Sequence, residues 1–384
     1  MNKKRNQTFV YLYVLAILMV IDDHCGTRIG FLSGIFPYNS FYMPLFVFAS
    51  GYFYRPGRLW DAIEHKTKKF AIPFIIYDAV MILLALIIDS IFNTRWSRSV
   101  SLKTILRMLA GHPTTTLNGA AWFVMMLFWV SIGYCIIRAV FFESRLNDYL
   151  LTAIFILCGF VSLYICILLP VDEREVLKVI RGLCKIAFYI QFYHLGYMFN
   201  RYGESLLNRL KKRDVCLFCV AVNVFLIMIY GDQINFYETE GMESFHSVVL
   251  PLITSVTGIL FYYEVMRFLS GKIGERKELS FIGRNTFVIM EVHLLFVNIP
   301  NFYVYHAIVH GSSKYNDFPV DQFVNNTWVR YSPNTKLAGF FCGVIGVSSL
   351  RICWKGRRDY IKRAFRQVIR CEPEMEGGYP EGSQ

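Results

Sequence analysis

Ile21-Asp22-Asp23-His24-Cys25-Gly26 ends the first apolar run of the chain, and Asn39-Ser40-Phe41-Tyr42-Met43-Pro44 opens the second. Two acids and a histidine therefore stand at the end of one apolar helix and face the start of the next. Ionisable groups are costly at membrane depth, so they mark a functional site by default. We expect this hairpin, which runs on to Tyr54, to form half of an active site.

The composition is that of a membrane protein. Of the 384 residues 55% are hydrophobic, and the mean hydropathy is +0.39, whereas soluble domains are roughly 45–50% apolar. Apolar runs of about 17–23 residues recur along the chain, and each can cross about 30 Å of hydrocarbon. We expect an all-α bundle of about ten transmembrane helices in one membrane domain, residues 1–354. No small-x-small cleavage site follows residue 20, so the first helix should be retained.

The expected spans are bounded only to within a few residues. A basic amphipathic linker that contains Trp60 separates the second span from the third, and two long outer connections cover residues 93–119 and 306–334. The spans are residues 8–23, 40–54, 70–92, 120–142, 149–169, 182–199, 215–230, 248–269, one that begins after residue 286 and carries Glu291 and His293, and 336–354.

The net charge of +12 is distributed as in a membrane protein rather than a nucleic-acid-binding protein. Basic clusters fall on alternate connections, as the positive-inside rule predicts for cytoplasmic loops. We therefore expect both termini in the cytoplasm, a basic tail over residues 355–384 with a disordered end, contacts with membrane lipids and no nucleic-acid partner. The clusters are Lys3 to Arg5, Arg55 with Arg58, Lys66 with Lys68 and Lys69, and residues 201–213, 272–277 and 355–370.

His24 has the neighbours that a general base needs. A neutral imidazole can accept a hydroxyl proton while a carboxylate fixes its tautomer, and Asp22 or Asp23 could serve in that way. From Arg5 to His24 the helical rise is about 28 Å, which places His24 near the outer boundary of the hydrocarbon, with Tyr42 at a similar depth. The alternative is an interfacial turn that is merely exposed to water.

Glu291 and His293 form a second candidate. The helical rise from Arg284 to His293 is about 13 Å, which places His293 near the midplane. The two histidines then need not touch, because a substrate could span the gap. Ionisable residues at that depth must face a cavity or a partner, although a core histidine with satisfied hydrogen bonds remains the alternative. The spacings His306-x-x-x-His310 and Cys216-x-x-Cys219 lack further ligands, so we expect no metal site.

Five stretches then form a pattern in register: Asp22 to Cys25, residues 38–53, residues 68–74, Trp122-Phe123, and Ile282 to Thr286 with His293. Together they resemble the integral-membrane acyltransferase type 3 family, most closely its branch of fucose 4-O-acetylase-like enzymes, over nearly the whole chain. Two positions depart from the family pattern. Tyr13 stands where the family often has Arg or Lys, and Tyr42 stands where it often has His.

The resemblance implies an O-acyltransferase of a bacterial cytoplasmic membrane. It would move an acyl group, usually acetyl from cytoplasmic acetyl-CoA, to a hydroxyl of a cell-surface or lipid-linked glycan. Acetyl-CoA would be a cosubstrate, and no cofactor would be bound permanently. His24 takes the position of the family's essential histidine, as base or acyl carrier oriented by Asp22, with Asp23 and His293 as further catalytic candidates.

The remaining candidates divide between the two substrates. Basic residues of the second connection would attract the phosphates of CoA, and sugar specificity would lie in the outer connections. A glycan or lipid transporter, or a non-catalytic membrane subunit, could use the same buried polar residues; a transporter predicts symmetric interrupted helices, and no internal symmetry is visible. The expected substrate-binding residues are Tyr42, Ser50, Trp122, Asn285 and Glu291, and the expected CoA-binding residues are Arg58, Lys66, Lys68 and Lys69.

Overall fold

The computed structural model describes residues 6–27, 29–30, 32–97, 101, 114–141, 144–170, 175–234, 246–329, 331 and 335–346. The secondary structure in these ranges is entirely helical, which confirms the expected all-α class. Seven helices there are long and apolar enough to cross a membrane. They are Gln7–Cys25, Leu59–Phe92, Thr116–Val140, Arg145–Leu168, Lys212–Tyr230, Leu250–Ile273 and Thr286–Val309.

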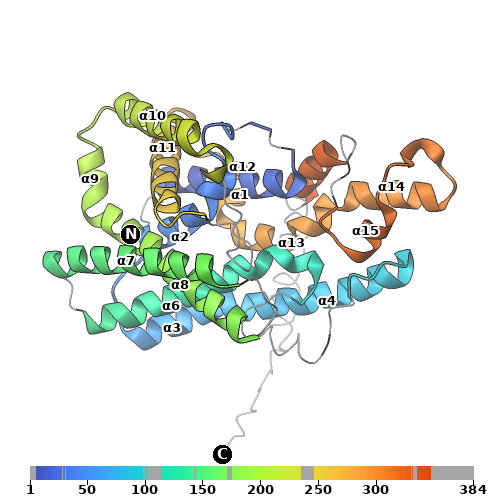
Figure 1. Cartoon of the computed structure of the whole chain (residues 1–384), viewed down its shortest axis with the longest axis horizontal. Helices are drawn as coiled ribbons and strands as arrows, with labels where there is room; N and C mark the ends of the chain where they lie inside the picture. The colour runs from blue at the N-terminus through green and yellow to red at the C-terminus, as the bar shows by residue number, and fades with distance from the viewer. Residues whose placement is uncertain are drawn as a thin grey trace, which may run out of the picture.

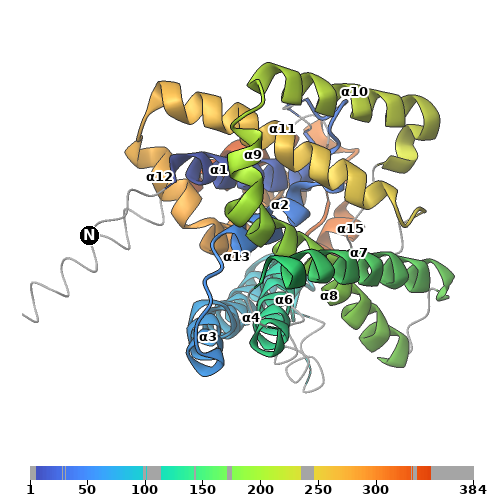
Figure 2. The same ribbon diagram turned by 90° about the vertical axis from the view of Figure 1, so that its left-hand side faces the viewer.

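Long helices lie side by side along the long axis of the molecule. α4 (Ile72–Phe92) and α6 (Trp122–Val140) run along it in Figure 1, whereas α1 (Gln7–Cys25) and α7 (Arg145–Leu168) are inclined to it, as Figure 2 shows. Figure 2 looks along this axis, and α4 and α6 are seen end on. The arrangement is that of a transmembrane helix bundle, in which each backbone polar group is satisfied within its own helix.

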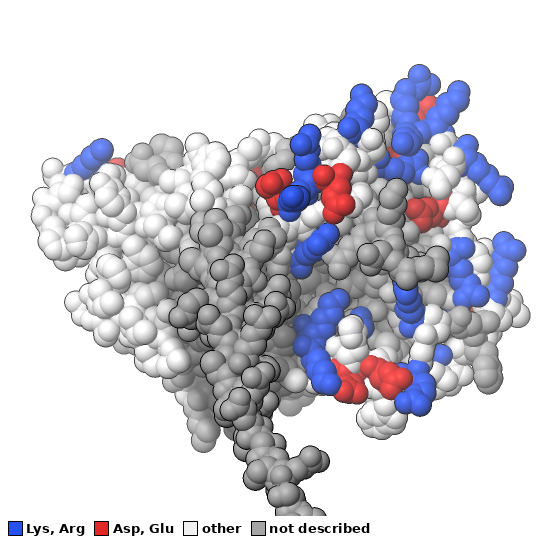
Figure 3. Space-filling model, turned by 180° about the vertical axis from the view of Figure 1, so that it is seen from behind, with Lys and Arg blue, Asp and Glu red and all other residues white. Residues whose placement is uncertain are grey.

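The two ends of the bundle differ in charge. α3 (Leu59–Lys66) and α9 (Glu204–Leu207) lie at one end, and α14 (Ile299–Val309) and α15 (Val320–Asn325) lie at the other (Figure 1). Figure 3 views the molecule from behind and shows Lys and Arg gathered toward the α3 and α9 end. That end is the one the positive-inside rule assigns to the cytoplasm.

Several element boundaries differ from those expected. The linker around Trp60 is helical. It forms α3, which continues through a π-helical turn, η2 (Thr67–Ala71), into α4. The expected second span is the short helix α2 (Tyr42–Tyr52), preceded by η1 (Tyr38–Ser40). At about 1.5 Å per residue, α2 does not cross the bilayer alone. Of the last expected span, Lys336–Gly346 is helical; residues 347–354 and the basic tail lie outside the described residues.

α2 is held in the bundle by close packing on α8 (Glu175–Met198). A Cβ at Gly51 would overlap the Tyr193 carbonyl, and one at Gly196 would overlap the Phe48 carbonyl. Small residues let membrane helices approach in this way. The glycine that interrupts the second apolar run is therefore explained by helix packing.

α1 is the central helix of the site. It packs against α2, α11 (Leu250–Ile273), α12 (Lys277–Arg284) and α13 (Thr286–Val297). In its most apolar stretch of 18 residues, 78% of the residues are buried. The surrounding helices therefore hold both ends of α1 in place. The remaining helices are η3 (Thr116–Ala121), η4 (Phe199–Gly203), α10 (Lys212–Tyr230), η5 (Gly231–Ile234) and η6 (Ser313–Tyr315).

Candidate active site

α1 ends in a tight turn that frees the next residues to fold back. Gly26 adopts the left-handed conformation with φ 63°, which favours glycine, and its N–H bonds back to the carbonyls of Asp22 and Asp23. The turn leaves Asp22, Asp23 and His24 on the last turn of the helix. Asp22 is fully buried, whereas Asp23 and His24 are half-buried.

The Asp22 carboxylate fastens the following loop to α1. Its Oδ2 accepts from the Ile29 N–H at 2.9 Å and from the Tyr38 hydroxyl at 2.8 Å, and its Oδ1 accepts from the Thr27 hydroxyl. Burial and the Asp22 carboxylate raise the pKa of Tyr38, so its hydroxyl stays a donor. The expectation that Asp22 orients His24 is therefore wrong, because its carboxylate is directed to the loop.

His24 is paired with His293. Their Nδ1 and Nε2 atoms are 2.6 Å apart, and the two rings are nearly parallel, at 9°, with centroids 4.9 Å apart. We expected His293 near the midplane and His24 near the outer boundary, so that the two need not touch. The structure shows instead that the two histidines are in contact. The reason is that Gly283 packs on Val10, where a Cβ at position 283 would lie 2.6 Å from the Val10 carbonyl oxygen. α13 thus starts well inside the bundle, and its helical rise carries His293 toward the outer end.

The hydrogen bonds of His293 assign the tautomers of both rings. Its Nδ1 lies 2.9 Å from the Ile289 carbonyl oxygen and 3.0 Å from that of Met290. Carbonyl oxygens only accept, so Nδ1 carries the hydrogen and Nε2 of the neutral ring accepts. His24 then donates from Nδ1, and its own lone pair lies on Nε2. His293 fixes the tautomer of His24, the task expected of a carboxylate.

Trp328 lies against His24, and no pattern in the sequence indicated this contact. Its ring meets His24 edge-on with centroids 5.1 Å apart. It packs on Gly119, where a Cβ would lie 3.1 Å from the indole. Trp328 lies in a polar outer connection without helical periodicity, so its approach to His24 depends on how that connection folds.

The other expected substrate-binding residues are spread over the bundle. Tyr42 donates to Asp23 at 3.3 Å, beside the histidine pair. Asn285 donates to the Phe281 carbonyl where α12 meets α13. The ring of Trp122 faces the Lys185 ammonium at 4.1 Å. Ser50 lies at the opposite end, in the cavity described next.

A cavity of about 1040 Å³ opens at the basic end of the bundle. α1 contributes residues from Phe9 to Tyr13, its N-cap residue Asn6 also lines the cavity, and Tyr13 lies beside the Ser50 side chain. The Lys66 ammonium lies 3.4 Å from the Tyr193 hydroxyl. The basic residues that line the cavity are Arg55, Arg58, His65, Lys66, Lys69 and Arg284.

Lys68 does not line this cavity. It forms an exposed ion pair with Glu64. Lys66 and Lys69 are three positions apart and share a helical face, whereas Lys68 points away from that face. The structure thus brings three of the four expected CoA-binding residues together and adds Arg55, His65 and Arg284, which we did not select.

Glu291 faces a different neighbourhood from His293. It is 1% exposed, and neither of its carboxylate oxygens has a hydrogen-bond partner among the described residues. It lies near Asn118 and near Asp78 of α4, which accepts from Thr114 and Asn118. Asp78 is an ionisable residue inside an apolar run, so the membrane-depth criterion could have identified it.

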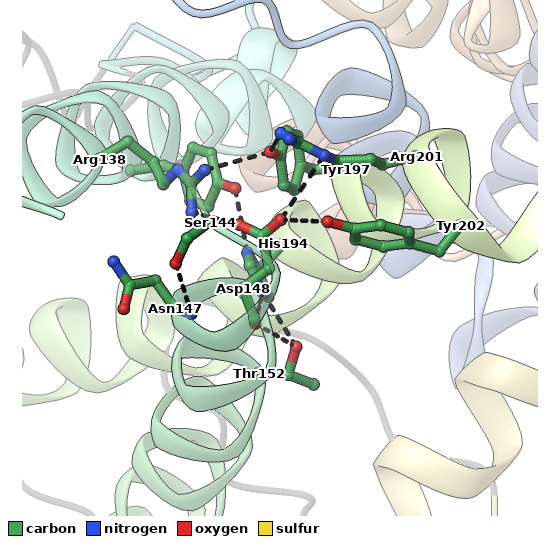
Figure 4. A network of polar contacts seen from close by, with 10 residues as sticks. Arg138, Ser144, Asn147, Asp148, Thr152, His194, Tyr197, Arg201 and Tyr202 are labelled. Carbon is green, nitrogen blue, oxygen red and sulfur yellow. Dashed lines mark hydrogen bonds and ion pairs between the residues drawn. The ribbon is translucent and has the colours of Figure 1, made fainter. Parts of the chain in front are cut away.

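A buried polar network joins α6, α7 and α8 (Figure 4). Arg138 donates to Asp148 at 2.7 Å and to the Tyr197 hydroxyl at 3.1 Å, and Tyr202 donates to Asp148 at 2.9 Å. His194 lies 3.0 Å from the Asp148 carbonyl oxygen. We did not select these residues, although Arg138 and His194 also interrupt apolar runs.

No metal cluster was found in the part of the chain that the structure describes. There, no group of three or more His, Cys, Asp or Glu side chains could hold an ion. His306 and His310 stack at 4.0 Å on the exposed surface of α14.

Together these features define a polytopic membrane protein in which ionisable side chains of separate helices converge at one end of a central helix. The sequence model of a family described as an acyltransferase domain matches residues 11–350. The chain therefore belongs to the acyltransferase type 3 family. No curated protein and no solved structure matches the chain. The match includes all five stretches that suggested the resemblance, and it supports a membrane acyltransferase.

Proposed function

We propose that the protein is an O-acyltransferase of a bacterial cytoplasmic membrane. It moves an acyl group, acetyl in the first instance, from acyl-CoA to a sugar hydroxyl of a cell-surface or lipid-linked glycan. The observation that carries this proposal is the placement of α1, which lines the basic cavity near one end and bears His24 at the other, where His24 pairs with His293 of α13. In this proposal the basic end faces the cytoplasm, with about ten spans and both termini on that side.

The basic cavity is the proposed donor site. Its Arg and Lys side chains provide charge-assisted hydrogen bonds for the phosphates of CoA. The hydroxyls of Tyr13 and Ser50 meet at its α1 wall and can bond the polar groups of the pantetheine arm. From Tyr13 to His24 the rise along α1 is about 16 Å, a distance that an extended pantetheine arm can cover in large part.

The histidine pair is the proposed catalytic group. His24 Nε2 takes the proton of the acceptor hydroxyl, and the oxygen attacks the thioester carbonyl. The new C–O bond forms as the C–S bond breaks, and CoA leaves as a thiolate that takes up a proton. If His24 carries the acyl group first, Nε2 attacks the thioester carbonyl, the C–S bond breaks and CoA leaves as a thiolate that takes up a proton. The acceptor oxygen then attacks the acyl carbon, the C–N bond breaks, and the released Nε2 takes up the proton of the acceptor hydroxyl. In both routes the His24 Nδ1–H donates to His293 Nε2 and stabilises positive charge on the ring.

The test is acyl transfer by purified protein in lipid vesicles, with labelled acetyl-CoA and extracted cell-surface glycans. Base catalysis contributes roughly 10²–10⁴-fold, so His24→Ala should lower transfer by that order. His310→Ala changes an exposed histidine remote from the pair and should leave transfer unchanged. Near-normal transfer by His24→Ala would remove the catalytic role, and glycan movement without acetyl transfer would favour a transporter.

A further inference from the structure

The outer segment around α15 is firmly anchored to the bundle. Phe323 is fully buried and packs against Trp96 and Phe302. The Trp96 indole N–H donates to the Phe323 carbonyl at 2.8 Å, and the Arg95 N–H donates to the Val324 carbonyl at 2.7 Å. Backbone bonds and a buried aromatic anchor give this segment a defined position, as a binding site requires.

The same segment reaches the histidine pair. The Thr327 hydroxyl donates to the Thr116 carbonyl at 2.8 Å, and the Asn301 amide donates to the Val329 carbonyl at 3.0 Å. These bonds hold Trp328 from both sides along the chain. Its indole thereby packs on Gly119 and meets His24 edge-on.

A cleft of about 530 Å³ opens on this segment, and Trp328 is shared between the cleft and the surroundings of His24. Its volume is in the range of small-molecule sites, roughly 300–1,000 Å³. The lining combines a carboxylate, side-chain amides and an indole. The residues are Pro319, Asp321, Gln322, Asn325, Asn326, Trp328 and Val329.

We propose that this cleft binds the acceptor and that it selects an uncharged pyranose over an acidic one. The amides donate and accept, so they can match sugar hydroxyls, and the carboxylate of Asp321 accepts from them. The indole offers an apolar face with a polar edge, which suits the C–H face of a pyranose ring. His24 is not among the lining residues, but Trp328 touches both the cleft and His24. In this proposal the bound sugar extends past Trp328, so that a ring hydroxyl reaches the base.

Selection against acidic sugars follows from charge. Asp321 is the one charged residue among the described residues that line the cleft. A uronate carboxylate or a sugar phosphate would therefore meet a like charge, and none of the described lining residues is a cation that could offset it. This inference rests on the proposed function, because it names the acceptor class of the same site.

The test measures binding separately from transfer. Purified full-length protein in detergent is titrated with methyl glucoside, methyl galactoside and methyl glucuronide, with saturation-transfer NMR as the readout. We expect at least one neutral glycoside to bind at least tenfold more tightly than the glucuronide. Asp321→Lys should remove or reverse that ratio, and Trp328→Ala should weaken neutral glycoside binding tenfold or more. Asp317→Lys is the matched control, because Asp317 is exposed nearby and does not line the cleft.

Each outcome bears on one proposal. Equal binding of glucuronide, or an unchanged ratio in Asp321→Lys, overturns the cleft assignment; Asp321 is exposed, so this variant keeps the test valid if Trp328→Ala fails to fold. Transfer from acetyl-CoA to the same glycosides is then measured. Binding without transfer counts against the proposed function alone. Transfer with an unchanged acceptor KM in Asp321→Lys counts against the cleft alone.

Discussion

At His293, two backbone carbonyls hold Nδ1 while Nε2 faces His24. This side chain is therefore a positioning residue, and its contribution can be separated from that of the base. A leucine at 293 cannot accept from His24, whereas the carbonyl oxygen of a glutamine can. Substitutions at position 293 therefore change the group that faces Nδ1 of His24.

We predict that His293→Leu lowers kcat by on the order of 10- to 100-fold, the range reported for partners that orient a working histidine in metal sites. His293→Gln should recover part of that loss, and KM for the acceptor should stay unchanged in both. The double variant His24→Ala/His293→Leu should be no slower than His24→Ala, because the residues act as a unit. Multiplicative losses in the double variant would show that His293 acts independently.

The sequence alone made His24 and His293 functional candidates, because each is ionisable at membrane depth. It made Tyr42 one because it lies at the depth of His24, at a position where the family often has His. It did not predict which of these side chains contact each other. Counting helical rise measures depth along one helix only, and it assumed that the helix of His293 starts at the membrane surface. Gly283 against Val10 shows a deeper start. The role given to Asp22 failed for a similar reason, since its partners come from a loop whose fold no periodicity encodes.

At the scale of the elements, the apolar runs gave most helices within a few residues, as for α7 and α10. The apolar runs did not predict where one helix continues into the next or which helix is too short to span the membrane. The linker around Trp60 joins α4 without a break, and α2 is too short to be an independent span. Hydropathy reports which residues avoid water, whereas α2 is buried by α8 through the Gly51 and Gly196 contacts. That packing is a property of two helices together.

The α2 and α8 contact gives a prediction with an internal control. Gly196→Ala places a methyl group against the Phe48 carbonyl, and overpacking of this kind costs about 1–3 kcal/mol or more. We expect a lower melting temperature in detergent. Gly182→Ala lies on the same helix with no atom within 4 Å of the added Cβ, so it should cause no loss. Equal stability of the two variants would contradict the close contact.

The network of Figure 4 predicts a larger effect at the junction of α6, α7 and α8. The side chains of Arg138 and Asp148 are 1% and 0% exposed, and removal of one partner of a buried pair costs about 3–5 kcal/mol. Asp148→Asn should therefore lower the melting temperature strongly, and Arg138→Met added to it should recover part of the loss. The exposed Arg213 and Asp214 pair supplies the control, and Asp214→Asn should melt as the wild type does.

At the scale of the whole molecule, α1 runs between two sites that need different chemistry, the basic cavity and the surroundings of His24. In the proposed function, the acyl-CoA donor needs cations at the cytoplasmic end, and the acceptor needs a hydroxyl-binding surface next to a base. The basic cavity and the cleft beside Trp328 lie at opposite ends of the bundle, so the acyl group alone has to pass between them. Transfer should therefore be vectorial, with donor and acceptor never sharing a compartment.

Sealed vesicles with acetyl-CoA on the basic side and a neutral methyl glycoside on the other test this arrangement directly. We expect acetylated glycoside in the acceptor compartment and none when both substrates are offered on the acceptor side. In the same vesicles Lys69→Gln, which removes a cavity cation, should raise KM for acetyl-CoA several-fold and leave KM for the glycoside unchanged. Lys68→Gln removes the neighbouring cation outside the cavity and should change neither. Equal KM shifts in the two variants would mean that the surface charge as a whole, and not the cavity, recruits the donor.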